Sequence, residues 1–237
     1  MPFTELSWRI FRPAEGFYTS EVETPGPLPV RTFLPTGYEP NYAYPLVVFL
    51  HGHGGNEEQI LRLAPRLSRR NYICIGLRGP QLLGQRNDGN HGYTWGTDGQ
   101  CDAILEDYML RAVEQTRRNY HVHSERIYLA GICEGATLAY RLALTFPEKF
   151  AGVAGLNGAL PPSGSLYLRL DDVRGLRAFV GHGIANAIVP LSTARSDARL
   201  LYTAGLDVQM NTYATTHRLH PDMLRDVNRW IMSQCNQ

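Results

Sequence analysis

The sequence predicts an α/β fold with a mostly parallel central sheet and helices on both faces. Two observations carry this prediction. Runs such as "PLVVFLHG" and "YICIGL" are apolar throughout and have the length of strands that are buried on both sides. Longer amphipathic segments with helical spacing separate these runs. This alternation is typical of parallel strands that are joined by crossover helices.

The elements of the first half follow in a regular order. The Pro-rich stretch 22–45 flanks short strand-like runs, which predicts edge strands joined by turns. The segment 56–70, "NEEQILRLAPRLSRR", has helical spacing with an acidic start and a basic end, which suits the dipole of one helix. We also expect strands at 45–52, 72–77 and 126–133, and helices at 101–120 and 134–146.

The same alternation continues to the C-terminus. Gly205 caps one predicted helix, and Pro221 occupies the first turn of the last one. We find no sign of a domain boundary, so we expect one domain over residues 1–237 in which residues 1–27 form an N-terminal extension with edge strands. The predicted elements are strands at 150–158, 177–183 and 207–214, and helices at 191–205 and 221–234.

Composition and charge argue against several classes of protein. The 237 residues are 43% hydrophobic and carry a formal net charge of +1, which does not indicate nucleic acid or an anionic membrane surface as a partner. The N-terminus has no apolar signal core, and no run reaches ~18 apolar residues. The cysteines Cys74, Cys101, Cys133 and Cys235 lack disulfide or zinc spacing. We expect a cytoplasmic protein with no membrane span.

The stretch "LAGICEGATLAY", residues 129–140, has the Gly-x-nucleophile-x-Gly spacing of a hydrolase elbow. An apolar strand leads into it and a helix leads out, which would hold Cys133 exposed at the N-terminus of that helix. The alternative is a small buried cysteine between two glycines. The adjacent Glu134 leaves one question open, because its carboxylate would raise the thiol pKa if it faced the sulfur.

The motif "LHGHGG", residues 50–55, ends the first buried strand and presents backbone N–H groups. We expect the N–H groups of His53 and Glu134 to form an oxyanion hole. His51 and His53 also suggest a metal site, but no third residue has the spacing of a ligand, and we expect neither metal nor cofactor.

Two later segments supply partners for the cysteine. "GHGIANAIVP", residues 181–190, follows a strand, and "TTH" ends at His217, just past the last strand. The order nucleophile, orienting residue, histidine is that of the same architecture. The rival histidines have other expected roles: His182 is structural, His220 caps the last helix, and His121 and His123 precede the elbow strand.

The segment 78–100 has no periodicity, and a loop of this length in a compact domain is usually functional or disordered. Its aromatic residues Tyr93 and Trp95 argue against disorder. They would either line a substrate cleft or seal the edge of the core.

These motifs together resemble the phospholipase/carboxylesterase branch of the α/β-hydrolases. The resemblance covers about residues 28–234 and rests on "LHGHGGNEEQI", "LRGP", "GICEGATLAYRLALTFPEKFAGVAGLNGALP", "HGIANAIVP" and the last helix. That branch reads G-x-S-x-G at the elbow and H-G-x-x-D-x-V-V-P later. The resemblance implies an α/β-hydrolase fold with Cys133 as nucleophile, Asn186 in the acid position and His217 as base. Dienelactone hydrolases of the same superfamily are similar in having a cysteine there.

This sequence departs from the family pattern at two positions, with Cys133 in place of the serine and Asn186 in place of the aspartate. The two departures make chemical sense together. A thiol can pass its proton to histidine before attack, so the third residue need only orient the ring, and an asparagine carbonyl can do so. We therefore expect a hydrolase of small carboxylic esters, thioesters or lactones that forms an acyl-cysteine. Cys133→Ser alone should lose almost all activity, because a neutral histidine beside Asn186 could adopt the wrong tautomer.

Other functions remain open at this stage. The chain could be a non-catalytic binding protein that kept the pocket, an acyl transferase, or a serine esterase with an altered active site. A homodimer is also compatible with the sequence.

Overall fold

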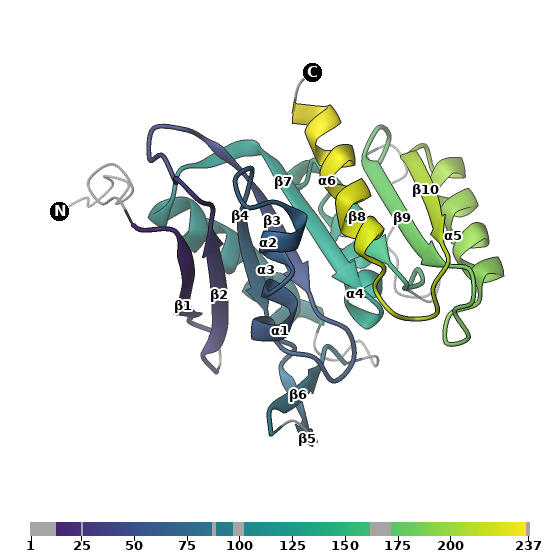
Figure 1. Ribbon diagram of the computed structural model, residues 1–237, viewed down its shortest axis with the longest axis horizontal. Coiled ribbons are helices and arrows are strands. Elements are labelled where there is room, and N and C mark those ends of the chain that lie inside the picture. The colour runs from purple at the N-terminus through teal and green to yellow at the C-terminus, as the bar shows by residue number, and fades with distance from the viewer. Residues whose placement is uncertain (1–12, 25, 87–88, 97–101, 162–171, 236–237) are drawn as a thin grey trace.

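The computed structural model describes residues 13–24, 26–86, 89–96, 102–161 and 172–235. Its main sheet has eight strands in the order β1-β2-β4-β3-β7-β8-β9-β10 (Figure 1). All neighbouring pairs from β4 to β10 are parallel, whereas β1 and β2 and then β2 and β4 pair antiparallel. This confirms the predicted α/β fold. The strands are β1 (Gly16–Val22), β2 (Leu28–Leu34), β3 (Tyr44–Leu50), β4 (Ile73–Leu77), β7 (Val122–Ile132), β8 (Gly152–Leu156), β9 (Arg177–Gly183) and β10 (Asp207–Tyr213).

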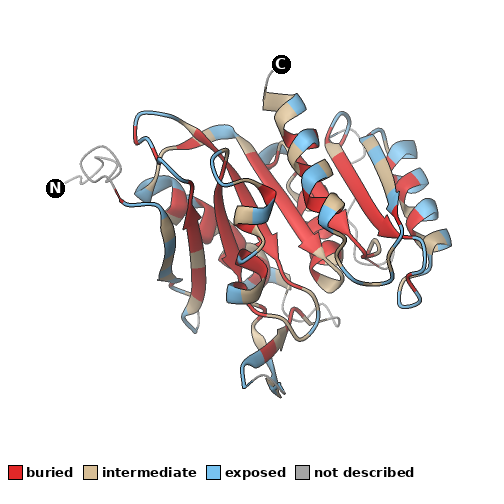
Figure 2. Ribbon diagram, in the orientation of Figure 1, coloured by how far each residue is buried: buried red, intermediate tan, exposed pale blue. Residues whose placement is uncertain are grey.

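Helices cover both faces of this sheet, and side chains alternate between two cores along each central strand. Val48 of β3 packs in the core under α3, α4 and α5, whereas Val47 and Phe49 pack under α1, α2 and α6. Figure 2 shows that the central strands are buried. The helices are α1 (Glu57–Leu61), α2 (Ala64–Leu67), α3 (Asp102–Asn119), α4 (Glu134–Thr145), α5 (Leu191–Thr203) and α6 (Pro221–Cys235), with a short 3₁₀ helix η2 (Pro147–Lys149).

A small hairpin of β5 (Gln81–Gln85) and β6 (His91–Thr94) projects from the edge of the sheet where the parallel strands end (Figure 1). It lies within the segment 78–100 that showed no periodicity. The hairpin pairs with the loop after β3, since Gly55 and Tyr93 form an antiparallel bridge.

Two predictions for the first half were wrong. The expected helix at 56–70 is divided into α1 and α2, and Pro65 lies in the first turn of α2, where a continuous helix would need its missing N–H. The strand β2 in the Pro-rich stretch lies between β1 and β4 instead of at an edge. Its Pro29 is tolerated because pairing with β4 begins only at Val30.

The single domain with an N-terminal extension stays a prediction. The strand β1 forms one edge of the sheet. Residues 1–12 and Pro25 of the expected extension lie outside the described residues, as does Cys101 at the expected start of α3.

Candidate active site

The backbone around Cys133 forms a sharp turn between β7 and α4. Cys133 has φ 55° and ψ −121°, a conformation that side-chain-bearing residues rarely adopt. A Cβ on Gly131 would lie 2.0 Å from the carbonyl oxygen of Gly135, and a Cβ on Gly135 would lie 2.3 Å from that of Leu50. Both glycines are therefore required by close backbone packing, and this geometry is that of a nucleophile elbow.

Cys133 is partly exposed and begins α4, so its sulfur lies at the positive end of the helix dipole. Its N–H donates to the carbonyl of Leu156, the last residue of β8, at 2.9 Å. The loop after β3 passes close by, because a Cβ on Gly52 would lie 3.1 Å from Cβ of Cys133. The alternative of a fully buried cysteine does not fit this exposure.

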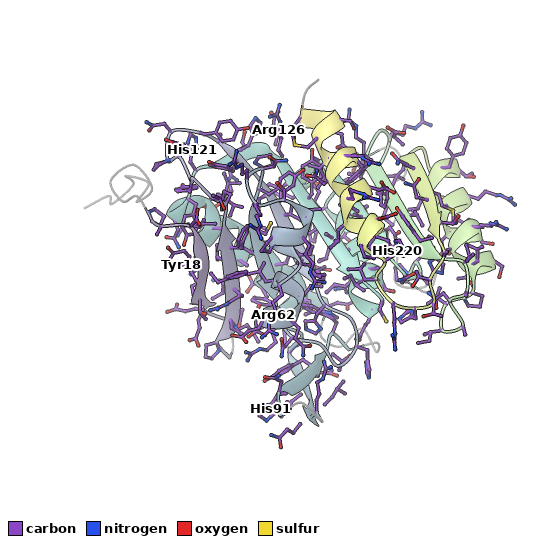
Figure 3. The ribbon with its side chains drawn as sticks, in the orientation of Figure 1. Tyr18, Arg62, His91, His121, Arg126 and His220 are labelled. Carbon is purple, nitrogen blue, oxygen red and sulfur yellow. The ribbon has the colours of Figure 1, made fainter. Side chains whose placement is uncertain are left out.

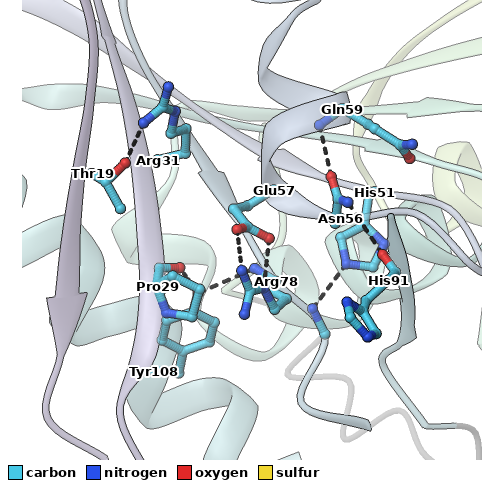
Figure 4. A network of polar contacts seen from close by, with 11 residues as sticks. Thr19, Pro29, Arg31, His51, Asn56, Glu57, Gln59, Arg78, His91 and Tyr108 are labelled. Atoms are coloured by element: carbon cyan, nitrogen blue, oxygen red, sulfur yellow. Dashed lines mark hydrogen bonds and ion pairs between the residues drawn. The ribbon is translucent and has the colours of Figure 1, made fainter. Parts of the chain in front are cut away.

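The imidazole of His51 is a structural group beneath that loop. Its Nε2 accepts the N–H of Gly79 at 2.9 Å (Figure 4). Its Nδ1 donates to the carbonyl of Gly52 at 2.8 Å. Burial lowers the pKa of His51, which keeps the ring neutral as these bonds require. Across the described ranges, no three His, Cys, Asp or Glu side chains lie together as metal ligands.

The expected oxyanion donors belong to the loop after β3 and to the start of α4. His53 follows β3 and Glu134 follows Cys133, and neither backbone N–H has an acceptor within the part of the chain that the structure describes. The hairpin fixes the loop, since Gly54 N–H donates to Tyr93 O and Tyr93 N–H donates to Gly55 O, both at 2.9 Å. Two backbone N–H groups without acceptors, on segments that pack together at Gly52 and Cys133, suit an oxyanion hole.

The Glu134 carboxylate is directed toward β6, which answers the question that the sequence left open. Oε1 accepts from the hydroxyl of Thr94 and from the N–H of Trp95, the latter at 3.3 Å. Oε2 is buried without a hydrogen bond, and Nδ1 of the exposed His53 ring lies 3.3 Å from it. His53 and Glu134 therefore form an ion pair whenever the His53 ring is protonated.

His217 and Asn186 meet as the chain order predicted. Nδ1 of His217 lies 3.0 Å from Oδ1 of Asn186, which is buried. The same oxygen accepts the N–H groups of Ile188 and Val189, each at 3.1 Å, so it must be the oxygen and not the nitrogen that faces the ring. His217 therefore carries its proton on Nδ1 and leaves Nε2 as a base. Burial first, and the charge of His182 second, lower the pKa of His217.

Among the described residues, Asn186 Oδ1 has no bond to any of the rival histidines. His182 is buried, with Nε2 2.9 Å from the carbonyl of Val189 and 3.3 Å from Nδ2 of Asn186. His220 accepts the N–H of Asp222 at the start of α6. His121 and His123 adjoin the first residue of β7, and Figure 3 shows His121 at the opposite end of the molecule from the hairpin.

The structure brings the predicted residues to one edge of the sheet without joining all of them. His53, Cys133, Asn186 and His217 follow the C-terminal ends of β3, β7, β9 and β10, where open α/β sheets bind ligands. Among the described residues, no hydrogen bond joins the sulfur of Cys133 to the ring of His217.

The two predicted substrate-binding residues, Tyr93 and Trp95, differ in exposure. Trp95 is 2% exposed. Its ring stacks on that of His51 with 4.7 Å between the ring centroids, and its Nε1–H donates to the carbonyl of His51 at 2.7 Å. It therefore seals the core edge, the second of its two expected roles. Tyr93 is partly exposed under the guanidinium of Arg78, 4.7 Å from its ring centroid, and contact between Tyr93 and substrate stays a prediction.

Sequence reasoning missed the roles of two supporting residues. Arg78 forms a two-bond ion pair with the buried Glu57, with Nε to Oε2 at 2.6 Å (Figure 4). The only signal for it was "LRGP" in the family resemblance. The sequence suggests the vicinity of Asn157, after the preceding strand, only as a second place to seek the orienting residue, and no pattern in it predicts the hydrogen bonds that the Asn157 side chain makes.

Comparison with known proteins agrees with this geometry. A family model described as Phospholipase/Carboxylesterase matches residues 39–235. The chain belongs to this family. Its relatives include proteins with thioesterase and esterase names.

Two of these relatives are named acyl-protein thioesterase 1. The protein of Gibberella zeae is 25% identical over 150 residues, which cover 57% of this chain and 64% of the relative. That of Mycosarcoma maydis is 29% identical over 118 residues, which cover 47% of this chain and 49% of the relative. The matches therefore span less than two thirds of either relative.

Two carboxylesterase crystal structures are similar in fold. That from Mesorhizobium loti has a TM-score of 0.69 at 20% identity, covering 86% of this chain and 94% of its own. The carboxylesterase from Bacillus cereus has a TM-score of 0.65 at 20% identity, and the match covers 80% of this chain and 88% of the Bacillus chain. Both support the α/β-hydrolase fold. In the described parts of the chain, no helix is long and apolar enough to cross a membrane.

Proposed function

We propose that this protein hydrolyses carboxylic esters or thioesters through an acyl-cysteine on Cys133, with His217 as base and then acid and Asn186 as the orienting residue. One observation carries the proposal. The oxygen of Asn186 is held by two backbone N–H groups and accepts from His217 at 3.0 Å, which fixes the tautomer that a base needs. A protein that had kept only a binding pocket would not need this arrangement.

In the first half of the reaction, the thiol proton passes to Nε2 of His217 as the sulfur attacks the substrate carbonyl. The N–H groups of His53 and Glu134 donate to the oxyanion that forms. His217 then gives the proton to the leaving alcohol or thiol, and the carbonyl–heteroatom bond breaks to leave an acyl-cysteine.

The second half repeats these steps with water. His217 takes a proton from water, the resulting hydroxide attacks the acyl-cysteine, and the protonated ring returns its proton to the departing sulfur. The products are a carboxylic acid and the original thiol. No group outside the chain is needed for this cycle.

Substrate preference follows from the chemistry of the leaving group. We expect small aryl or short-chain acyl esters to react well, with Tyr93 as an apolar contact at the cleft. Amides should react poorly, because an amine leaves only when it is protonated.

The test is intact-protein mass spectrometry during incubation with p-nitrophenyl acetate. We expect an acetyl group on Cys133 that appears and then disappears as acetate is formed, and no adduct in Cys133→Ala. A protein that binds the ester without any adduct or turnover would favour the binding-protein alternative. An adduct on another residue would rule out Cys133 as the nucleophile.

A further inference from the structure

Asn157 follows the last residue of β8 and is completely buried. Its φ of 54° is in the left-handed region, which asparagine tolerates better than other side-chain-bearing residues. The residue before it, Leu156, accepts the N–H of Cys133. Asn157 thus lies one residue from the point where the elbow is bonded to the sheet.

The side chain of Asn157 bonds to two other segments of the site. Its Oδ1 accepts the N–H of Gly183 at 2.9 Å, at the end of β9. Its Nδ2 donates to the carbonyls of His217 at 3.3 Å and Arg218 at 3.1 Å. The opposite amide orientation would set N–H against N–H and oxygen against oxygen, so only this one satisfies all three partners.

Leu156 and Asn157 therefore connect the three segments that carry the proposed triad, Leu156 by its backbone carbonyl and Asn157 by its buried side-chain amide. Gly183 precedes Asn186 by three residues, and the backbone N–H of Asn157 also donates to Gly181 O at 2.9 Å. The His217 loop has other bonds, such as Ala185 N–H to Thr215 O at 3.1 Å and the Thr215 hydroxyl to Arg218 O at 3.3 Å, but among the described residues none of them reaches the backbone of His217 itself. Within the described residues, the carbonyl of His217 accepts only from Asn157.

We propose that Asn157 is a positioning residue that fixes the backbone of His217 and thereby aims its ring between Asn186 and Cys133. This inference rests on the proposed function, and it adds a residue that touches no reacting atom. Displacing a catalytic group by about 1 Å can cost about a hundredfold in rate, so a backbone anchor at this point should be visible in turnover.

The decisive variant is Asn157→Asp, which keeps the size of the side chain and the acceptor for Gly183. When ionised, its second oxygen would face the two carbonyls, and burial should raise its pKa. The titratable side chains on the segments that it contacts are His182, His217 and Arg218, while α6 approaches with the sulfur of Met223 at 4.0 Å. Only the protonated acid can donate to the carbonyl of His217.

We expect kcat for p-nitrophenyl acetate to fall about 10- to 100-fold in Asn157→Asp, with KM changed less than about threefold. The ratio of wild-type to variant kcat should grow as pH rises and the acid ionises. An unchanged kcat, or a ratio that is independent of pH, would overturn the proposal. Asn228→Asp is the matched control, since Asn228 on α6 accepts from the hydroxyl of Tyr72 at 2.7 Å, and it should leave kcat unchanged.

A second variant and a second readout keep the result decisive. Asn157→Gly tolerates the positive φ and removes the anchor, so it should lower kcat without the pH-dependent ratio. The NMR signal of the His217 Nδ1–H proton should shift or broaden in both variants and remain in Asn228→Asp. If the wild type does not turn over, the proposed function fails, and this signal still decides the role of Asn157: an unchanged signal refutes it.

Discussion

Oδ1 of Asn186 lies 3.0 Å from Nδ1 of His217 and also accepts the N–H groups of Ile188 and Val189. Rotating the amide would break both backbone bonds. The wrong histidine tautomer that normally follows from an Asp-to-Asn change is therefore opposed by the loop itself. Because the amide of Asn186 is held in this orientation, the expected activities of variants at Cys133 and Asn186 differ from those expected from the sequence alone.

Cys133→Ser should lose less activity than the sequence alone suggested. The expected near-complete loss depended on a rotated amide, which the loop around Asn186 opposes. What remains is the missing carboxylate charge beside the imidazolium, and we expect kcat/KM to fall about a hundredfold instead of about ten-thousandfold. The measurement is kcat/KM with p-nitrophenyl acetate in Cys133→Ser and in Cys133→Ser with Asn186→Asp, which should regain most of the loss. Equal activity in these two variants would show that Asn186 does not orient the base.

Asn186→Asp alone should match or exceed the wild type in kcat/KM. Nε2 of His182 cannot both donate to Val189 O and accept from the Asn186 amide, which lies 3.3 Å away. A carboxylate oxygen at this place would accept the His182 N–H and resolve the conflict. Asn186→Ala is the comparison, and it should lose about a hundredfold or more because His217 loses its partner. An aspartate variant as poor as the alanine variant would contradict this account.

The activity should have an acid limb with a midpoint below 6.5. Burial lowers the pKa of His217 from its ordinary value of 6.5, and the neutral ring is the form that accepts a proton. Activity is therefore lost as pH falls through the lowered pKa and is retained above it. A pH profile of kcat/KM measures this midpoint, and Asn186→Asp should raise it because a carboxylate stabilises the imidazolium. A midpoint above 6.5 in the wild type would contradict the burial argument.

Cys133 should react with iodoacetamide before the other cysteines near neutral pH. It is partly exposed at the N-terminus of α4, whereas Cys74 is fully buried and burial raises its thiol pKa. Cys235 is also partly exposed and serves as the internal reference, and peptide mapping over time gives the rates. Equal labelling of Cys133 and Cys235 would argue against an activated thiol.

Sequence patterns predicted the sheet and the partners of the site for a physical reason. Apolar runs and chain order are local signals, and they located β3, β7 and β9 and paired Asn186 with His217. The direction of the Glu134 carboxylate was not predictable, because Thr94 and Trp95 reach it from a hairpin 40 and 39 residues away in the chain. The role of Asn157 is likewise invisible, since its side chain bonds to backbone groups of other segments.

The pairing of Gly55 with Tyr93 joins the β5–β6 hairpin to the loop after β3 that carries His53. A single methyl group at Gly92 would lie 2.8 Å from the carbonyl oxygen of Gly54, the residue after His53. A side chain at this position of β6 would therefore displace the loop that carries the N–H of His53, the proposed oxyanion donor. Leu82 and Leu83 of β5 are exposed, so we expect substitutions there to change turnover little, whereas a substitution at Gly92 would lower it although Gly92 lies outside the proposed catalytic residues.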